Sequence, residues 1–322
     1  REKGILSEKG GLGMENSEIY DIIILGGGPA GLTAGLYAAR SGRRTLLLEG
    51  LAPGGQMARS SRIGNYPGFP EAVDGVLLAR SMETQARKFG LEVCRAQATS
   101  LKLTGNPKCL ETDAGDFLGR AVILAGGSQP RRLNLPGEER LTGRGVHYCA
   151  ACDGFFYRGK TVAVVGGGNS AAGEALHLAG LAKRVILVHR RDSLRAERTS
   201  YARLLAAENV EFRWNSEITC LLGEDALTGI RVRDSRTGME TEISCDGLFV
   251  SIGRRPATEL LAGQLALDEK GYLPAGETTE TEIPGVFAAG DIRAKPLRQI
   301  ITAAADGAVA AQMAEEFLSL MR

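Results

Sequence analysis

The chain has 322 residues, and its 39 lysines and arginines nearly balance 38 aspartates and glutamates, giving a net charge of +1. A charge this small provides no strong field for nucleic acid or an anionic membrane, and no apolar run approaches the ~20 residues of a membrane span. Six cysteines are too few for a secreted disulfide scaffold, so the composition predicts a soluble, cytoplasmic protein long enough for two domains.

Residues 1–18 are expected to be a disordered leader, because the first thirteen are charged and glycine-rich and no apolar signal-peptide region follows. Ile19 to Leu25 is apolar and β-branched, which predicts a buried parallel strand. The strand leads into the loop GGGPAG and then into a helix from Leu32 to Arg40. A GxGxxG loop in this context is typical of dinucleotide binding, since its glycines let the backbone approach a pyrophosphate. The expected nucleotide contacts are Gly26, Gly28, Pro29, Ala30 and Gly31.

A second predicted strand, Thr45 to Leu48, ends at Glu49. A carboxylate at this position can accept hydrogen bonds from a ribose 2′-hydroxyl. The first loop is therefore predicted to bind an adenosine that lacks a 2′-phosphate, as in FAD or NAD.

Beyond this unit, the pattern predicts an amphipathic helix from Val76 to Phe89, a strand from Leu91 to Cys94, a meander to Asp116 and an apolar strand from Ala121 to Leu124. A cluster of glycine and proline at 125–130 ends that strand. The first domain boundary is predicted there, after residue 128.

The central motif is Cys149-Ala150-Ala151-Cys152, in which two thiols at CxxC spacing can close a disulfide ring or bind a metal. A structural zinc site needs four ligands. The other cysteines are single and scattered: Cys94, Cys109, Cys220 and Cys245. The spacing therefore favours a redox-active dithiol over a metal site, and no metal ligand is assigned.

A second strand–loop–helix unit follows, with a strand from Thr161 to Val165, the loop GGGNSA and a helix to Ala179. The next strand, Arg184 to Val188, is followed by arginines where the first unit has Glu49. Arginines after a strand are often only a solvated rim, but guanidinium groups suit a 2′-phosphate, so the register of the repeat predicts NADPH rather than NADH. The predicted contacts are Gly167, Gly168, Asn169, Ser170, His189, Arg190, Arg191 and Arg195.

Residues 210–245 alternate as in a β-meander, and an apolar strand from Gly247 to Ile252 precedes a Gly-Arg-Arg-Pro break. This break is the second predicted boundary, after residue 256. Val286 to Asp291 is predicted as a strand that delivers an aspartate at its carboxyl end, where ligands bind in such sheets. The last predicted helix, Gln299 to Leu320, has a face of small residues for close packing.

The motifs GGGPAG, CAACDGFFY, GGGNSA, HRRDSLRAE and FAAGD occur in the order and spacing of one family. From about Ile19 onward, the chain resembles the low-molecular-weight, bacterial-type NADPH-dependent thioredoxin reductases. The resemblance implies an α/β fold of two Rossmann-like, three-layer ββα domains. The FAD domain is then in two parts, 19–128 and 257–322, with the NADPH domain, 129–256, inserted between them. It also implies a homodimer that passes electrons from NADPH through FAD to thioredoxin.

By the same resemblance, further residues fall at positions that contact FAD: Gly55, Gln56, Asn65, Gly290, Asp291, Arg298, Gln299 and Ile300. Cys152 is expected to face the flavin and Cys149 to attack the partner disulfide. Asp153 is expected to exchange protons with the dithiol, the alternative being a solvated carboxylate. His147 is interpreted as incidental, as a lone histidine near such a motif more often is.

The nicotinamide and the dithiol both belong to the inserted domain and both need the same flavin. That domain is therefore expected to rotate about the segments 126–130 and 253–256. Arg144, Phe155 and Phe156 match positions near the partner-docking surface of the family, although core packing explains the two phenylalanines equally well.

The sequence departs from the family at Gly173-Glu174, where paired glutamates are common, and at Gly126 and Leu194. Two related enzyme classes fit less well. A peroxiredoxin-reducing flavoprotein would carry an N-terminal CxxC module, which residues 1–18 are too short to hold. The glutathione-reductase-like branch uses a C-terminal histidine, and no histidine follows His189. An intact CxxC with two complete glycine loops also disfavours a redox sensor without turnover.

Overall fold

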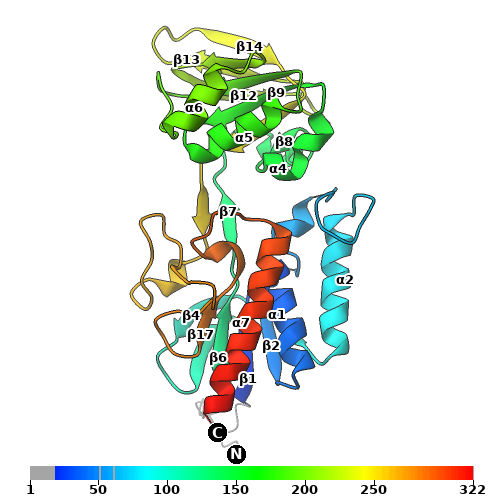
Figure 1. Cartoon of the computed structure of the whole chain (residues 1–322), viewed down its shortest axis with the longest axis vertical. Coiled ribbons are helices and arrows are strands. Elements are labelled where there is room, and N and C mark those ends of the chain that lie inside the picture. The colour runs from blue at the N-terminus through cyan, green and yellow to red at the C-terminus, as the bar shows by residue number, and fades with distance from the viewer. Residues whose placement is uncertain (1–18, 51, 61, 322) are drawn as a thin grey trace, which may run out of the picture.

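The computed structural model describes residues 19–50, 52–60 and 62–321, so the predicted leader lies outside the described residues. The chain forms two α/β lobes (Figure 1). They are connected by β7 (Ser128–Pro130) and β16 (Arg254–Pro256), which pair with each other as antiparallel strands. The two connections between the lobes therefore run side by side.

The first lobe is built on a seven-stranded sheet. Five of its strands, β3, β2, β1, β6 and β17, are parallel, and β5 and β4 continue it as antiparallel strands. Strand β17 comes from the C-terminal part of the chain and pairs Val286 with Val122 of β6. The strands are β1 (Ile19–Leu25), β2 (Thr45–Glu49), β3 (Glu92–Arg95), β4 (Ala98–Lys102), β5 (Lys108–Thr112), β6 (Gly115–Leu124) and β17 (Val286–Ala288).

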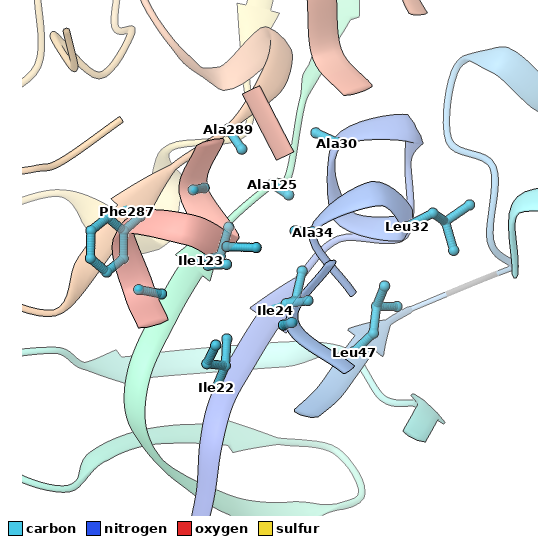
Figure 2. Packing of buried hydrophobic residues seen from close by; sticks show 14 of the residues in the cluster. Ile22, Ile24, Ala30, Leu32, Ala34, Leu47, Ile123, Ala125, Phe287 and Ala289 are labelled. Carbon is cyan, nitrogen blue, oxygen red and sulfur yellow. The ribbon is translucent and has the colours of Figure 1, made fainter. Parts of the chain in front are cut away.

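Three helices cover this sheet: α1 (Pro29–Arg40), α2 (Gly75–Lys88) and α7 (Ile300–Leu320). Figure 2 shows Ile24 and Ile123 of the strands packed beneath Ala34 of α1, in one buried cluster. Helices α1 and α7 approach so closely that a Cβ on Gly307 would overlap the backbone carbonyl of Ala30. No helix in the described part of the chain is long and apolar enough to cross a membrane.

The second lobe has three layers. Its central sheet is parallel, in the order β11-β10-β9-β15-β8, and an antiparallel sheet β12-β13-β14 covers one face. Alternate residues of β9 point to opposite cores, so that Ala163 packs with Ile230 of the small sheet and Val164 packs with Ala175 of α5. The strands are β8 (Val146–His147), β9 (Thr161–Gly166), β10 (Arg184–Val188), β11 (Val210–Arg213), β12 (Ser216–Leu222), β13 (Gly229–Asp234), β14 (Glu240–Ser244) and β15 (Gly247–Ser251).

Helices α5 (Asn169–Ala179) and α6 (Arg198–Leu205) belong to this second lobe. The remaining elements are short: α3 (Glu138–Leu141), α4 (Ala150–Asp153), η1 (Met57–Arg59), η2 (Gly154–Tyr157), η3 (Glu259–Leu261) and η4 (Gly290–Ile292).

Most predicted elements are confirmed, and the strand 184–188 has the predicted bounds. The strand expected to reach Asp291 ends at Ala288, because Gly290 adopts a left-handed φ of 78° and turns the chain into η4. Strand β12 lies within the predicted meander 210–245, and a register shift between Ile218 and Cys220 interrupts its pairing with β13. Helix α6 was not predicted.

Replacing Gly307 with alanine is expected to destabilise the protein by about 2 kcal/mol, because the added methyl group forces α1 and α7 apart. The matched control is Gly173→Ala in α5, where nothing lies within 4 Å of the added Cβ. There, helix propensity alone should stabilise the protein by up to about 1 kcal/mol. Urea unfolding of both variants measures the difference, and a stabilised Gly307→Ala protein would contradict the packing argument.

Candidate active site

Cys149 and Cys152 form a disulfide with their Cα atoms 5.3 Å apart, as the CxxC spacing predicted. Cys149 is the N-cap of α4, which is a single helical turn. The backbone N–H groups of Cys152 and Asp153 donate to the Cys149 carbonyl at 3.2 and 3.1 Å. This turn closes the disulfide ring and places Asp153 directly after the second sulfur. The other cysteines are free thiols: Cys94, Cys109, Cys220 and Cys245.

The disulfide faces the first lobe, since α4 lies on the side of the second lobe that is turned toward it (Figure 1). Gln299 Nε2 lies 3.8 Å from each sulfur. Asn65 Nδ2 donates to Gln299 Oε1 at 3.0 Å and to the Ala151 carbonyl at 3.3 Å. Two side chains at predicted flavin-contacting positions therefore touch the CxxC turn.

Asp153 is paired with His147 at the end of β8. Asp153 Oδ2 lies 3.2 Å from His147 Nδ1, and His147 Nε2 lies 2.7 Å from the Tyr157 hydroxyl. Burial raises the pKa of Tyr157 to about 12, and the nearby charges of Asp153 and Asp246 add to this effect. The sequence suggested that His147 is incidental, but the fold brings its ring into contact with the predicted proton carrier.

Glu174 in α5 is a second carboxyl group beside the CxxC turn. Burial raises the pKa of Glu174 to about 7. Hydrogen bonds from Ser251 and from the backbone N–H of Ala150 lower this pKa and so oppose the shift. Its Oε2 atom is buried without a hydrogen-bond partner. The second lobe thus holds a carboxyl group with a pKa near neutral pH. This group lies beside the turn that carries the disulfide.

The first glycine loop leaves open space at the N-terminus of α1. Gly28 is the N-cap without a side-chain cap, and nothing lies within 4 Å of where its Cβ would be. Gly27 donates its backbone N–H to Glu49 Oε2 at 2.7 Å. Open backbone donors beside a carboxylate fit a dinucleotide whose adenosine has a free 2′-hydroxyl. The other predicted residues of this loop are Gly26, before the turn, and Pro29, Ala30 and Gly31, in the first turn of α1.

Other predicted flavin contacts gather at the same end of the first-lobe sheet. A Cβ on Gly55 would lie 3.3 Å from Gly28 Cα, so the two loops touch. Gly290 follows β17, and its N–H donates to Asp306 Oδ2 at 2.9 Å. Gln56, Arg298, Gln299 and Ile300 lie in the segments that begin η1 and α7.

Asp291, the aspartate predicted beyond the last strand, lies between this end of the sheet and the interlobe connection. Its Oδ2 is 3.7 Å from Arg254 Nη2 in β16. Burial raises the pKa of Asp291, and Arg254 and Arg298 oppose the shift. The fold therefore brings Asp291 to the carboxyl end of the parallel strands, as predicted, and ties it to β16.

The second glycine loop repeats the geometry of the first. Gly168 is the N-cap of α5 without a side-chain cap, and nothing lies within 4 Å of where its Cβ would be. Gly167 lies against the His189 ring, which leaves no room for a Cβ. His189 is buried with no hydrogen-bond partner at Nε2. Burial lowers the pKa of His189, and so do three nearby guanidinium groups, those of Arg195, Arg191 and Arg190.

These three arginines are exposed, and none forms an ion pair with a carboxylate of residues 19–50, 52–60 or 62–321. The backbone N–H of Arg195 donates to the Gly167 carbonyl at 2.7 Å, which holds the arginine segment against the loop. Asn169 and Ser170 begin α5, and Asn169 Oδ1 accepts a hydrogen bond from the Glu197 N–H at 2.8 Å. Open backbone donors beside three cations fit a dinucleotide with a 2′-phosphate.

The predicted docking residues have different surroundings. Phe155 is 65% exposed, so core packing is wrong for this side chain. Phe156 packs partly on the helical core of the second lobe, and the Arg62 guanidinium lies 4.3 Å from its ring centroid. Arg144 is exposed. Arg62 belongs to the first lobe, so its contact with Phe156 joins the two lobes.

Sequence reasoning missed Glu174, Tyr157 and Arg62. Glu174 was noted only as part of a departure from the family, because its hydrogen bond with Ser251 joins it to a distant segment, the end of β15. Tyr157 stands four residues after Asp153, but its contact with His147 requires the fold of the whole second lobe. No signal in the sequence identifies Arg62.

A family model of the pyridine nucleotide-disulphide oxidoreductases matches residues 20–307. The chain therefore belongs to this family of oxidoreductases. The match spans both glycine loops and the CxxC turn, so it covers every part of the site described above.

Known proteins confirm the narrower resemblance seen in the motifs. The thioredoxin reductase of Streptomyces clavuligerus is 44% identical over 308 residues, which are 95% of this chain and 96% of that protein. The crystal structure of the Streptococcus pyogenes thioredoxin reductase has 40% identity, covers 94% of this chain and 99% of that one, and superposes with a TM-score of 0.89. The Lactococcus lactis thioredoxin reductase in its FR conformation has the same identity and coverage but a TM-score of 0.65. The predicted fold of two Rossmann-like domains is thereby confirmed.

The stability of the protein should depend on pH through Glu174. Its folded pKa of about 7 lies above the ordinary 4.5, so its contribution is fully present below pH 4.5 and is lost as the pH rises through 7. Glu174→Gln removes the charge and keeps the shape. We expect its free energy of unfolding to exceed that of the wild type by about 3 kcal/mol at pH 8 and to match it near pH 4.5.

Urea unfolding across this pH range measures the effect. The matched control is Glu208→Gln, which removes an exposed carboxyl group of the same lobe. If Glu174→Gln and wild type show the same pH dependence, Glu174 is not the buried, proton-binding group described here.

Proposed function

We propose that the protein is a flavoprotein disulfide reductase that passes electrons from NADPH through FAD and the Cys149–Cys152 pair to oxidised thioredoxin. The observation that carries this proposal is the position of the disulfide against Gln299 and Asn65, at the end of the sheet where the first glycine loop opens. Relatives named thioredoxin reductase support the class of the partner.

The first lobe would hold FAD, through the loop at Gly28, Glu49 and the segments 290–291 and 298–300. The second lobe would hold NADPH, through the loop at Gly168 and the arginines after β10. When bound, these cofactors supply the electron pair that opens the disulfide. The opposite charges beside the two loops support this division.

The reduced pair would then act by thiol–disulfide exchange. The Cys149 thiolate attacks the partner disulfide, which forms a mixed disulfide and releases one partner thiolate. Cys152 attacks the Cys149 sulfur, which releases the second partner thiolate and restores the enzyme disulfide. Cys152 is assigned to the flavin side, since its sulfur also lies 4.0 Å from Gln299 Oε1. Asp153 would carry protons from the enzyme thiols to the partner.

The second lobe would rotate between the two half-reactions, with β7 and β16 as the hinge. Two thioredoxin reductases support this motion, because they have equal identity to this chain and equal coverage of it but TM-scores of 0.89 and 0.65. Because sequence identity is equal, we attribute the difference in TM-score to a different relative orientation of the two lobes in the two proteins. Rotation would break the contact between Arg62 and Phe156 and present Phe156, beside Phe155, to the partner.

We also propose that the protein works as a homodimer in the cytoplasm. Its four free thiols fit a reducing compartment. Val76 and Leu77, exposed at the start of α2, form an apolar surface that suits a second copy of the chain.

Purified protein loaded with FAD is expected to oxidise NADPH rapidly when oxidised thioredoxin is present. With NADH the rate should be at least about tenfold lower, the factor that one charge-assisted hydrogen bond to the 2′-phosphate represents. Cys149→Ser should abolish thioredoxin reduction, because the attacking sulfur is gone, while NADPH still reduces the flavin. NADPH absorbance and flavin absorbance follow the two steps. A wild-type flavin that is reduced while thioredoxin stays oxidised would point to a different disulfide partner.

Joining the lobes in the present orientation should stop turnover. The double variant Arg62→Cys, Phe156→Cys replaces two side chains in contact across the lobes, and a short bismaleimide can link them. We expect the linked protein to lose NADPH-dependent thioredoxin reduction, because the disulfide cannot leave the first lobe. The Arg62→Cys single variant, treated with the same reagent, is the control and should stay active. Full turnover of the linked protein would rule out rotation.

A further inference from the structure

We propose that His147 is a positioning residue for the proton-transfer carboxyl of Asp153, and that Tyr157 sets the direction of its N–H donor. The inference rests on the proposed function, in which Asp153 carries protons for the dithiol. It adds a residue that the family motifs do not assign to this reaction.

The first support is the pairing of the two side chains. His147 Nδ1 lies 3.2 Å from Asp153 Oδ2, and the side chains are only 9% and 20% exposed. Asp153 ends a helix of a single turn, which by itself gives a carboxyl group little orientation. The contact with His147 is the only ion pair or hydrogen bond of the Asp153 side chain within the described ranges 19–50, 52–60 and 62–321.

The second support is the partner on the other ring nitrogen. The Tyr157 hydroxyl lies 2.7 Å from His147 Nε2. Because burial raises the pKa of Tyr157 to about 12, this hydroxyl keeps its proton and can donate it to Nε2. A neutral imidazole that accepts at Nε2 carries its hydrogen on Nδ1, which faces Asp153.

The third support is the rigidity of the histidine. His147 lies in β8, where it pairs with Phe249 of β15. Its ring stacks on the Phe249 ring, with centroids 5.3 Å apart and planes inclined by 27°, and the Tyr157 ring meets it edge-on. A donor held by a sheet and by two aromatic rings can fix the orientation of a carboxyl group on a short turn.

The chemical consequence follows from the exchange step. As Cys152 attacks the Cys149 sulfur of the mixed disulfide, the S–S bond within the enzyme forms and the bond to the partner sulfur breaks, with the electron pair leaving on the partner. Asp153 accepts the Cys152 proton and then gives it to the leaving partner sulfur. The His147 N–H donates to the carboxylate present before and after this transfer, and so holds it in one orientation beside the dithiol.

Other titratable groups also face this cluster. Glu174 of α5 interacts with Asp153, and Asp246 and Cys245 act on Tyr157. The Lys160 ammonium lies 5.3 Å from the Tyr157 ring centroid. The His177 ring, in the last turn of α5, packs against Gly154. The test below keeps all of these groups constant except His177, which serves as the control.

The test uses the complete FAD-loaded protein, reduced with dithiothreitol, and measures alkylation of Cys149 and Cys152 by iodoacetamide across pH. His147→Leu removes the donor, so the carboxylate is less stable, and we expect the acid inflection of the alkylation curve to move up by about one pH unit. Thioredoxin turnover at neutral pH should fall by about tenfold, the low end for one hydrogen bond to a charged group. His147→Asn keeps an N–H near the position of Nδ1 and should restore most of both properties. His177→Leu should change neither.

A double-mutant cycle separates positioning from a structural role. In an Asp153→Asn background the carboxyl group that His147 orients is absent, so His147→Leu should have no further effect on alkylation or turnover. Equal effects of His147→Leu in both backgrounds would overturn the proposal, and so would an unshifted inflection. The alkylation curve does not require thioredoxin. A wild-type protein that fails to reduce thioredoxin therefore refutes the proposed function, while the shift still decides the role of His147.

Discussion

The site is arranged around the contact between the Gln299 amide and the two sulfurs. Through this contact a side chain of the first lobe touches the disulfide of the second lobe. Gln299 is fixed as the N-cap of α7 by a reciprocal pair of hydrogen bonds with Thr302. Helix α7 is in turn packed on α1, whose N-terminus opens at the first glycine loop. One pair of closely packed helices therefore fixes where the disulfide of the second lobe lies relative to the first glycine loop.

The two glycine loops differ little, and under the proposed function this small difference distinguishes two dinucleotides. Both have an open N-cap glycine before a helix, so their backbones offer the same donors to a pyrophosphate. They differ at the end of the next strand, where β2 delivers Glu49 and β10 delivers His189 and a group of arginines. The buried, uncharged His189 fills the space behind Gly167, so the positive charge stays on the outer side, where a phosphate can reach it.

Much of this architecture could be predicted from the sequence, because the strands of both parallel sheets are short apolar runs bounded by glycine loops. The fold class, the disulfide and the position of Asp291 followed from such local patterns and from the family resemblance. Contacts between distant segments did not. His147 pairs with Phe249 of β15, and Glu174 is hydrogen-bonded to Ser251 of the same strand. A pKa or an interlobe contact such as that of Arg62 depends on neighbours that no local pattern identifies.

The pairing of β6 with β17 has a consequence for how the chain folds during synthesis. Val122 and Val286 are neighbours in one sheet, yet the whole second lobe lies between them in the chain. Strands β8 to β15 are consecutive, so the second lobe can fold as soon as it leaves the ribosome, before β17 and α7 exist. The entropy cost of closing a loop grows only slowly with the length of the loop. Here the second lobe forms the loop between β6 and β17, and pairing of β7 with β16 brings its two ends together. The lobe that carries the disulfide can therefore fold first. Once folded, it holds the two parts of the other lobe close together in space, so that β17 can pair with β6.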